Sequence, residues 1–451
     1  MPKLEKKLTL YGLTMIAVGG CIGSGIFATP NGVLQAVPHH GLALVVWALG
    51  GLIALTGVLT FAELGGLFPK AGGVYVYIKE AYGKLAGFLY GWVILLVINT
   101  GALAALSVVF VNYMKFFIPD MSETRKTVLA LLTIGGLTIM NMIGVNISQF
   151  FTNLFSGFKL AAIAAIIAAG VIFYQPAEVN LQLMTVSDPA LSDNLLSAML
   201  VGLIGVLWSF GGWHHASYLS GETKNAQTTV PRAMILGVSI VTVVYLFANL
   251  AYMMLLPLPE MTASTAVAGD ALQKLPGLGD IGGKIASVII AISIFGTIGI
   301  YTMSAPRIYF AMARDGVFFS ALAKVHPKYH TPVNAMATQA VWAIVLLLVW
   351  NNFEDLIAFV TFMDIVFMTL AGISVFIFRK RLPEAVRPYR VFLYPVVPLI
   401  FILISAAFVF NTLVERPLHA WAGIGILALG IGAFYYFKGA NTNVGEGIDE
   451  P

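Results

Sequence analysis

The sequence predicts an all-α integral membrane protein with about twelve transmembrane helices. Of its 451 residues, 59% are hydrophobic and only 10% are charged, whereas soluble domains carry roughly 25% charged residues. The apolar residues fall in runs of about 20, the length that a helix needs to cross roughly 30 Å of hydrocarbon. A membrane β-barrel would show short alternating segments instead. A helical bundle is therefore the expected fold class.

Twelve spans can be placed along the chain, each uncertain at its ends by a few residues. They lie at about 10–35, 41–66, 85–117, 127–144, 148–174, 194–220, 232–256, 281–311, 333–350, 355–378, 391–414 and 420–437. No polar insertion between them is long enough to fold alone, so residues 1–438 are expected to form one membrane domain. The polar tail 439–451, rich in Gly and Asn, is expected to be disordered.

The distribution of Lys and Arg predicts the orientation of the chain. An even number of spans places both termini on one side. With both ends inside, eighteen of the 25 Lys and Arg residues are cytoplasmic and six are external, and Lys159 alone falls within a span. Cytoplasmic loops carry the excess of Lys and Arg. We therefore expect a multi-pass protein of the cell membrane, with the N and C termini in the cytoplasm.

The segment Phe68–Lys84 is too polar to span the membrane. Its tyrosines, proline and paired glycines are compatible with an interfacial or re-entrant piece and equally with an ordinary loop. The net charge of +4 is too small and too dispersed to indicate a nucleic-acid partner. The single cysteine, Cys21, excludes an internal disulfide.

The first predicted span contains four glycines in seven residues, from Gly19 to Gly25. Each weakens a helix by roughly 1 kcal/mol, so this span is expected to unwind near mid-membrane. Freed backbone groups must then line a cavity or meet a ligand. Amides at the start of the following half-helix suit an anionic group, and upstream carbonyls suit a cation, so a zwitterion fits the pair. Close helix packing through small residues is the alternative.

The sixth predicted span carries the same feature, because Gly211 and Gly212 lie among aromatic residues at a similar depth. Spans 1 and 6 hold matching positions in two five-helix halves. Paired interruptions of this kind are typical of inverted-repeat transporters whose binding site lies between the breaks. The expected arrangement is one repeat over residues 8–175, a second over 193–380, and two extra helices over 391–438.

Several motifs resemble the amino acid–polyamine–organocation superfamily, and specifically its L-type amino acid transporter branch. In chain order they are GCIGSGIF (20–27), FAELGGLFPKAGGVYVYIKEAYG (61–83), WSFGGW (208–213), GETKNAQTTVPRAM (221–234), SAPRIYFAMARDG (304–316) and HPKYHTPV (326–333). They extend over most of the chain in the order that the family shows. The resemblance implies a fold like that of the bacterial leucine transporter and no cofactor.

The resemblance also implies the binding residues. It places the substrate carboxylate on the backbone amides of Ser24, Gly25 and Ile26. The substrate amino group would lie near the carbonyls of the segments from Ala17 to Gly20 and from Trp208 to Gly211, which includes Ser209. Trp208 falls where the family carries an aromatic gate over the substrate, although core packing is the alternative.

Lys159 is the one basic side chain well inside a predicted span. A cation in hydrocarbon is unfavourable unless it is paired or neutral, which marks a functional candidate. The resemblance implies that it replaces the cation of sodium-coupled relatives and ties the broken helix 1 to helix 8. Loss of its proton would instead couple transport to H⁺, and snorkelling to the cytoplasmic face is a third possibility.

The residues around the second break predict a neutral substrate. Cation-selective relatives often carry an acidic residue just after this break, where the chain has Gly212 and Trp213. Without a counter-ion, a cationic side chain is poorly accommodated. Small amino acids such as serine, threonine or alanine are expected. The roles of the four remaining polar candidates stay open: Glu63, His214, His215 and Asp364. Arg307 is one conceivable partner of Glu63.

The predicted function is sodium-independent exchange of small neutral L-amino acids by alternating access. Proton symport is the alternative within transporters, and a sensor or channel on a transporter scaffold is the alternative outside them. An enzyme is not expected, because the chain lacks a His-Glu-x-x-His pattern and a phosphate-binding loop. Animal members of the branch bind a glycoprotein through a cysteine between helices 3 and 4. Residues 116–126 contain none, so no disulfide-linked subunit is expected.

Overall fold

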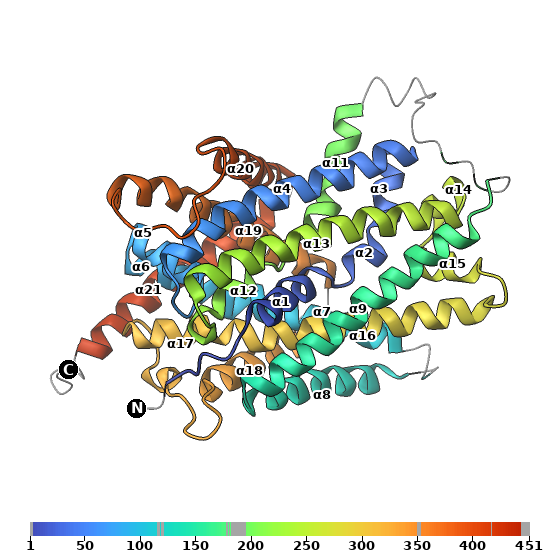
Figure 1. Cartoon of the computed structure of the whole chain (residues 1–451). Coiled ribbons are helices and arrows are strands. Elements are labelled where there is room, and N and C mark those ends of the chain that lie inside the picture. Colours follow the sequence, from blue (N-terminus) through green and yellow to red (C-terminus); the bar gives the residue numbers. More distant parts are fainter. Residues whose placement is uncertain are drawn as a thin grey trace.

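The computed structural model describes residues 3–114, 118, 121–176, 179, 181, 195–349, 353–415 and 417–442. Within these residues the chain is helical, apart from connecting segments and one isolated parallel β-bridge between Leu8 and Thr223. The long helices form one elongated bundle, and the segment before the first helix lies at the same end as the last helix terminus (Figure 1). This is the all-α class that the composition predicts.

The first half of the chain contains the helices up to the gap in the described residues. They are α1 (Leu10–Cys21), α2 (Gly25–Ala28), α3 (Pro30–Ala36), α4 (His40–Leu67), α5 (Val74–Tyr82), α6 (Lys84–Val93), the π-helix η1 (Ile94–Ile98), α7 (Asn99–Met114), α8 (Glu123–Met142) and α9 (Val145–Phe173). The helices α6, η1 and α7 follow one another without a break, so the third predicted span is a continuous helix with one π-helical turn.

The second half begins with another interrupted helix. Its elements are α11 (Leu195–Ser209), α12 (His215–Tyr218), η2 (Ser220–Glu222), α13 (Ala226–Leu255), α14 (Leu258–Ala263), α15 (Val267–Gln273), α16 (Asp280–Ser304), α17 (Pro306–Arg314), η3 (Ser320–Ala323), α18 (Val333–Val349), α19 (Phe353–Arg381), α20 (Val396–Glu415) and α21 (Pro417–Thr442). The eighth predicted span divides at Ala305, where Pro306 begins α17, because proline suits the first turn of a helix.

Nine helices or helix runs within the described residues are long and apolar enough to cross a membrane. They are Leu10–Ala28, His40–Leu67, Lys84–Met114, Val145–Phe173, Ala226–Leu255, Asp280–Arg314, Val360–Arg381, Val396–Val414 and Trp421–Lys438. The apolar helices α11 and α18 are shorter, and α8 lies where the fourth span is predicted. The chain is a multi-pass membrane protein.

Two predicted boundaries near the C terminus differ from the structure. The eleventh span begins at Val396 instead of Val391, because Val391–Pro395 precede α20 as a connecting segment. The last helix continues through Thr442, so residues 439–442 of the predicted tail are helical. The rest of that tail, 443–451, lies outside the described residues.

The polar segment after α4 forms the helix α5, which lies at the end of the bundle that carries both termini (Figure 1). Six of the nine residues of α5 are buried, including all of Val74–Ile78, and Gly83, at φ +95°, separates it from α6. Asp315 accepts hydrogen bonds from Tyr75 at 2.8 Å and Lys79 at 2.9 Å. Most of this segment is therefore a helix and not an irregular loop.

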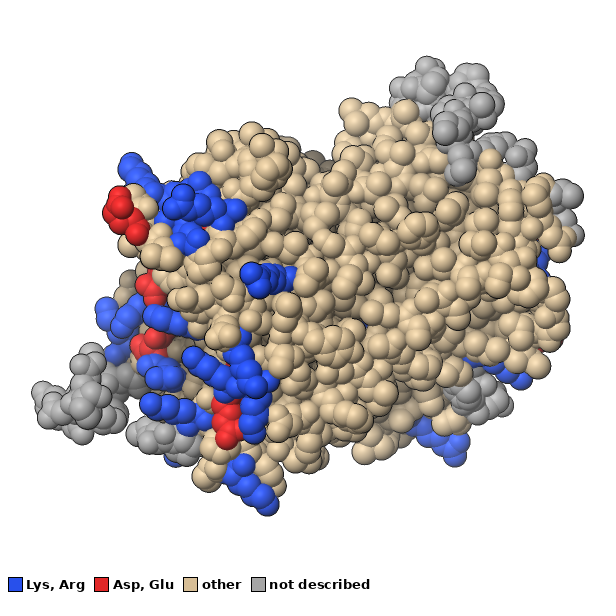
Figure 2. All heavy atoms as spheres, viewed as in Figure 1, with Lys and Arg blue, Asp and Glu red and all other residues tan. Residues whose placement is uncertain are grey.

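The helix α1 lies in the interior of the bundle, where it contacts α13, α9, α16 and α12. Along its length only Leu10, Tyr11 and Met15 are not buried. The interruption after α1 is therefore enclosed by helices from both halves of the chain. Lys and Arg gather at the end of the molecule that carries α5 and α17, and a broad belt without charge separates them from the other end (Figure 2).

Candidate functional site

The first interruption lies between α1 and α2. The helix α1 ends at Cys21, the segment Ile22–Ser24 is not helical, and α2 begins at Gly25. The first N–H groups of a helix have no acceptor within it. Among the described residues no acceptor is present for the N–H groups of Ser24, Gly25 or Ile26. Three adjacent donors thus remain available at this point.

The second interruption lies between α11 and α12. The helix α11 ends at Ser209, the next five residues form turns, and α12 begins at His215. Gly212 has φ +95°, a left-handed conformation that glycine adopts without a Cβ penalty. Both interruptions that the glycine patterns predict are thus present in the structure.

The two interruptions touch each other. A methyl group placed on Gly20 would lie 2.7 Å from the carbonyl oxygen of Gly212, and one placed on Gly212 would lie 2.4 Å from that of Gly20. A methyl group on Gly25 would meet Ser209 Oγ at 2.5 Å. Only glycine allows this approach, so the residues Gly20, Gly25 and Gly212 bring the two unwound segments into backbone contact.

The contact between the two interruptions borders space that no other atoms of the described residues fill. A methyl group on Gly23 would find only Thr297 Oγ1 within 4 Å, at 3.9 Å, and one on Gly211 only the Trp208 carbonyl at 3.2 Å. Gly211 is exposed and Ser24 is partly exposed, although their neighbours Phe210 and Ile26 are buried. The unpaired amides therefore border an accessible region.

Tyr245 of α13 joins the two interruptions, and the sequence analysis did not identify it. Its buried hydroxyl lies 3.0 Å from the carbonyl oxygens of both Cys21 and Ser209. The ring contacts Phe210 at 5.0 Å and Trp47 at 5.6 Å between centroids. The same span holds a second tyrosine, Tyr252, and the polar Asn249, so the sequence carried no specific signal for Tyr245, whose position opposite the breaks depends on how α13 packs.

Lys159 of α9 is fully buried and reaches the end of α1. Its ammonium donates to the carbonyls of Gly19 at 2.9 Å and Ile22 at 2.6 Å, and to Thr297 Oγ1 of α16 at 2.8 Å. Ser293 adds a hydroxyl donor to Ile22 O at 3.2 Å and Gly23 O at 3.1 Å. Each of the three ammonium hydrogens has an acceptor, which fits the charged form, and the side chain does not snorkel.

Three other residues of the predicted site, Ser209, Trp208 and Ala17, lie at different distances from the contact between the two interruptions. Ser209 is buried, and its hydroxyl bonds with Thr29 Oγ1 at 3.1 Å and donates to the Gly205 carbonyl at 3.0 Å. Trp208, one residue before the end of α11, is 39% exposed. Ala17 lies inside α1, fully buried, and faces Gly237 of α13, so it lies one turn before the break.

Two of the carbonyls predicted to bind the substrate amino group have no hydrogen-bond donor among the described residues. The carbonyl of Gly19 accepts from Lys159, that of Ser209 from Tyr245, and that of Trp208 from the Gly211 amide at 3.0 Å. Among the described residues no donor reaches the carbonyls of Gly20 and Gly211. Each break therefore contributes one free carbonyl beside the free amides of α2.

A buried polar cluster continues from the second break toward the end with the termini. His215 Nδ1 lies 2.6 Å from Ser304 Oγ, and the hydroxyls of Tyr90 and Tyr218 lie 2.7 Å apart. Asp364 of α19 belongs to the same region, one helical turn before Phe367, whose ring contacts that of Tyr90 at 5.4 Å. Its Oδ1 is buried, and no partner for it is found among the described residues.

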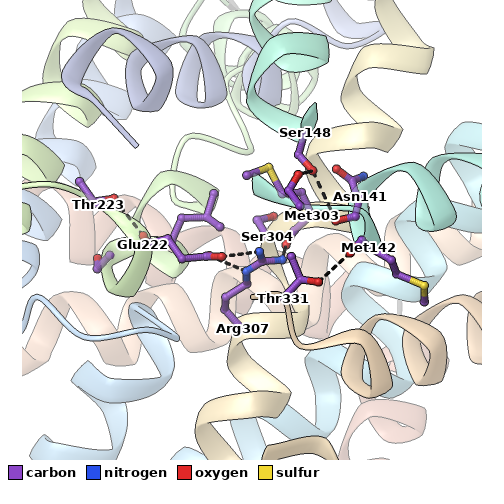
Figure 3. Close-up of polar contacts among 12 residues, drawn as sticks. Asn141, Met142, Ser148, Glu222, Thr223, Met303, Ser304, Arg307 and Thr331 are labelled. Atoms are coloured by element: carbon purple, nitrogen blue, oxygen red, sulfur yellow. Dashed lines mark hydrogen bonds and ion pairs between the residues drawn. The ribbon is translucent and has the colours of Figure 1, made fainter. Parts of the chain in front are cut away.

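The conceivable pairing of Glu63 with Arg307 is wrong. Glu63 accepts from Arg379 Nε at 2.9 Å and Nη2 at 2.7 Å, and lies 3.2 Å from Arg387 Nε. Arg307 instead donates from Nε and Nη2 to the two oxygens of Glu222, at 2.7 Å each, and from Nη1 to the Met303 carbonyl (Figure 3). The partners of Glu63 lie more than 300 residues away in sequence, so spacing gave no indication.

The chain before α1 covers the Glu222–Arg307 pair. The amides of Lys7 and Leu8 both donate to the Glu222 carbonyl at 2.9 Å, and the Lys224 amide donates to Leu8 O at 2.9 Å. Leu8 is fully buried there. These contacts connect the start of α1 with the segment between α12 and α13, at the end of α1 opposite its interruption.

The arrangement can bind a small zwitterion, because free amides and free carbonyls meet beside an accessible region. Within the described residues no group of three or more His, Cys, Asp or Glu side chains could hold a metal ion.

Comparisons with known proteins identify the family of the chain. The family model described as amino acid permease matches residues 8–434. The serine/threonine exchanger SteT of Bacillus subtilis is 33% identical over 96% of this chain and 97% of its own length. The human Asc-type amino acid transporter 1 is 32% identical over 96% of this chain and 82% of its own length. The human large neutral amino acids transporter small subunit 2 is 31% identical over 96% of this chain and 80% of its own length. The chain belongs to the amino acid permease family, within the amino acid–polyamine–organocation superfamily.

Proposed function

We propose that this protein exchanges small neutral L-amino acids across the cell membrane by alternating access. It does so with twelve transmembrane helices arranged as two inverted repeats, 8–175 and 193–380, and two extra helices. The observation that carries the proposal is the contact between the two interrupted helices, where three adjacent N–H groups find no acceptor among the described residues. Similarity to a serine/threonine exchanger and to neutral amino acid transporters supports the substrate class.

The substrate carboxylate binds the amides of Ser24, Gly25 and Ile26. A helix N terminus stabilises an anion through its free donors and its dipole. The substrate ammonium binds the carbonyls of Gly20 and Gly211, for which no donor is found among the described residues. Because these groups belong to the backbone, they recognise the part that all α-amino acids share, and side-chain selection must come from the surrounding residues.

Lys159 supplies the positive charge that a bound sodium ion would otherwise contribute at the end of α1. Its contacts with Gly19, Ile22 and Thr297 connect α9, the interruption and α16. The similarity to a serine/threonine exchanger favours exchange over proton symport.

A neutral substrate side chain fits the second break, which presents Gly211, Gly212 and Trp213 without a carboxylate. Small size fits the close packing of Ser209 and Phe210, both of which are buried.

The end of the bundle that carries both termini is cytoplasmic in this proposal, as the accumulation of Lys and Arg there suggests (Figure 2). The Glu222–Arg307 pair and the segment before α1 close the pathway on that side. The protein works without a disulfide-linked subunit, since its only cysteine, Cys21, is buried beside the breaks.

The function is tested with purified protein in liposomes. Uptake of radiolabelled serine should accelerate at least about tenfold when unlabelled serine is preloaded, and should be unchanged by sodium or by a pH gradient. Arginine and glutamate should compete poorly. Equal uptake into empty and preloaded vesicles would exclude exchange, and stimulation of uptake into empty vesicles by a pH gradient would establish the symport alternative.

Trp208 covers the bound substrate in this proposal. Truncation to alanine should weaken the apparent affinity for serine by about two- to tenfold, because a lost aromatic contact is worth roughly 0.5–1.5 kcal/mol. Trp421→Ala is the matched control, since Trp421 is 69% exposed on α21 and lies far along the chain from both breaks. Saturation curves in proteoliposomes measure both variants, and an unchanged curve for Trp208→Ala would assign this residue to packing.

A further inference from the structure

A pocket lined by arginines lies where α19 ends and the connection to α20 begins. It has a volume of about 170 Å³, and Arg379, Pro383, Arg387 and Arg390 line it. The pocket lies outside the amino acid site, at the end of α19 that carries the basic residues Arg379, Lys380 and Arg381. We call it the arginine pocket.

The charges around the arginine pocket do not cancel. Glu63 of α4 is buried, accepts hydrogen bonds from Arg379 and from the Val391 amide at 2.8 Å, and forms an ion pair with Arg387 at 3.2 Å. The segment 379–390 carries five basic residues, Arg379, Lys380, Arg381, Arg387 and Arg390, against the two carboxylates of Glu63 and Glu384. This surplus of positive charge borders a partly enclosed space, which favours an anion there.

The donors of the three arginines are used to different extents. Both terminal nitrogens of Arg387 donate to carbonyls at the end of α19 and just beyond it, including those of Phe378 and Leu382, so Arg387 holds the wall of the pocket in place. Arg379 Nη1 has no acceptor among the described residues, and its guanidinium stacks on the Tyr394 ring at 3.8 Å. Arg390 is exposed, and the described residues offer it no partner.

Apolar side chains flank the same pocket. On the connection between α19 and α20, the exposed fractions are 40% for Leu382, 85% for Val386, 66% for Phe392 and 60% for Leu393. In a membrane protein, a basic group beside exposed apolar residues lies at the boundary between headgroups and acyl chains. A cluster of Lys and Arg side chains is visible over this connection, beside the start of α20 (Figure 2, located with Figure 1).

We propose that the arginine pocket binds the phosphate group of an anionic phospholipid. Guanidinium groups bind phosphate through paired, charge-assisted hydrogen bonds, and the free donors of Arg379 and Arg390 supply them. The exposed apolar residues contact the acyl chains, which distinguishes a lipid from free phosphate. A zwitterionic lipid carries a compensating ammonium and binds more weakly.

The proposal is tested on the full-length protein, purified in detergent and titrated with phosphatidylglycerol, phosphatidylcholine or inorganic phosphate. Bound lipid is counted by native mass spectrometry. The wild type should retain phosphatidylglycerol in preference to phosphatidylcholine. Arg390→Gln should bind phosphatidylglycerol about fivefold more weakly, the effect expected for one basic residue at a membrane surface. Arg390→Glu should weaken binding further.

Arg125→Gln is the matched control, because Arg125 is an exposed arginine in the first turn of α8, and its lipid binding should equal that of the wild type. Arg390 is exposed and unpartnered, so its variants should fold, which the elution profile and melting temperature check. Equal phosphatidylglycerol binding by wild type and Arg390→Gln would overturn the proposal. Displacement of the bound lipid by millimolar inorganic phosphate would identify a site for free phosphate instead of lipid.

Discussion

Lys159→Ala is expected to lower serine exchange in proteoliposomes by more than about tenfold. The substitution removes the donor of three hydrogen bonds, and the carbonyls of Gly19 and Ile22 keep only the weaker hydroxyl donors Thr297 and Ser293. A hydrogen bond to a charged group contributes about 1.5–3 kcal/mol, and only 1.36 kcal/mol corresponds to tenfold in rate. The unwound segment should therefore lose the geometry that presents its amides to the substrate.

The control for Lys159→Ala is Ser156→Ala. Ser156 is buried on the same helix, three residues earlier, and its hydroxyl donates to the Met15 carbonyl of α1 at 2.9 Å. Removal of this bond tests a contact between α9 and α1 that involves neither of the carbonyls held by Lys159, and exchange should fall by less than about threefold. Thr297→Val, which removes one acceptor of Lys159, should give an intermediate loss. Normal exchange by folded Lys159→Ala would exclude the proposed role.

Arg307→Gln is expected to give the largest loss of stability among single charge removals in this protein. Glu222 and Arg307 are 0% and 1% exposed, and their bidentate contact leaves no solvent to replace a missing partner. Removal of one partner of a buried ion pair costs about 3–5 kcal/mol, because the other charge stays buried and uncompensated. For a chain of this length that corresponds to a drop of about 3–5 °C in melting temperature.

The double variant Glu222→Gln/Arg307→Gln should recover more than half of that loss, since two amides can bond with each other and carry no charge. Lys274→Gln serves as the control on an exposed pair, in which Lys274 lies 2.8 Å from Glu260 and both side chains are about half exposed. Such pairs contribute about 0–1 kcal/mol, so its melting temperature should change by less than about 1 °C. Melting curves of detergent-purified protein measure all three variants. A double variant less stable than Arg307→Gln would show that the lost charge pair does not explain the effect.

The two predictions concern different parts of the transport pathway. Lys159 supports the interruption itself, where the proposed substrate site lies. The Glu222–Arg307 pair connects α17 to the segment that the chain before α1 covers, on the side closed to the cytoplasm in the proposed function (Figure 3). Lys159→Ala should therefore impair transport more than stability, whereas Arg307→Gln should impair stability first.

Several features of the site could be predicted because they depend on local sequence. Four glycines within seven residues disfavour a helix wherever the segment lies, and the interruption between Cys21 and Gly25 follows. The pair Gly211–Gly212 gave the second interruption in the same way. Lys159 was identifiable because a charge in the middle of an apolar run needs partners whatever the fold.

Other features depend on which helices become neighbours, and this depends on packing between segments far apart in the chain. Tyr245 could not be assigned to the site, because its hydroxyl meets carbonyls that precede it by 224 and 36 residues. The partners of Glu63 were likewise decided by the position of α19 beside α4, which brings Arg379 and Arg387 to it and leaves Arg307 to Glu222.

The sequence alone determined that this chain forms a bundle of membrane-spanning helices and that two of them are interrupted, because hydropathy and glycine content act within each segment. Only the tertiary structure decided that Gly20 and Gly212 touch, which amides and carbonyls stay free beside them, and which acceptors Lys159 finds. Hydrogen bonds and close contacts between distant segments depend on distances of a few tenths of an ångström. No pattern along a single chain specifies such distances before its helices have packed.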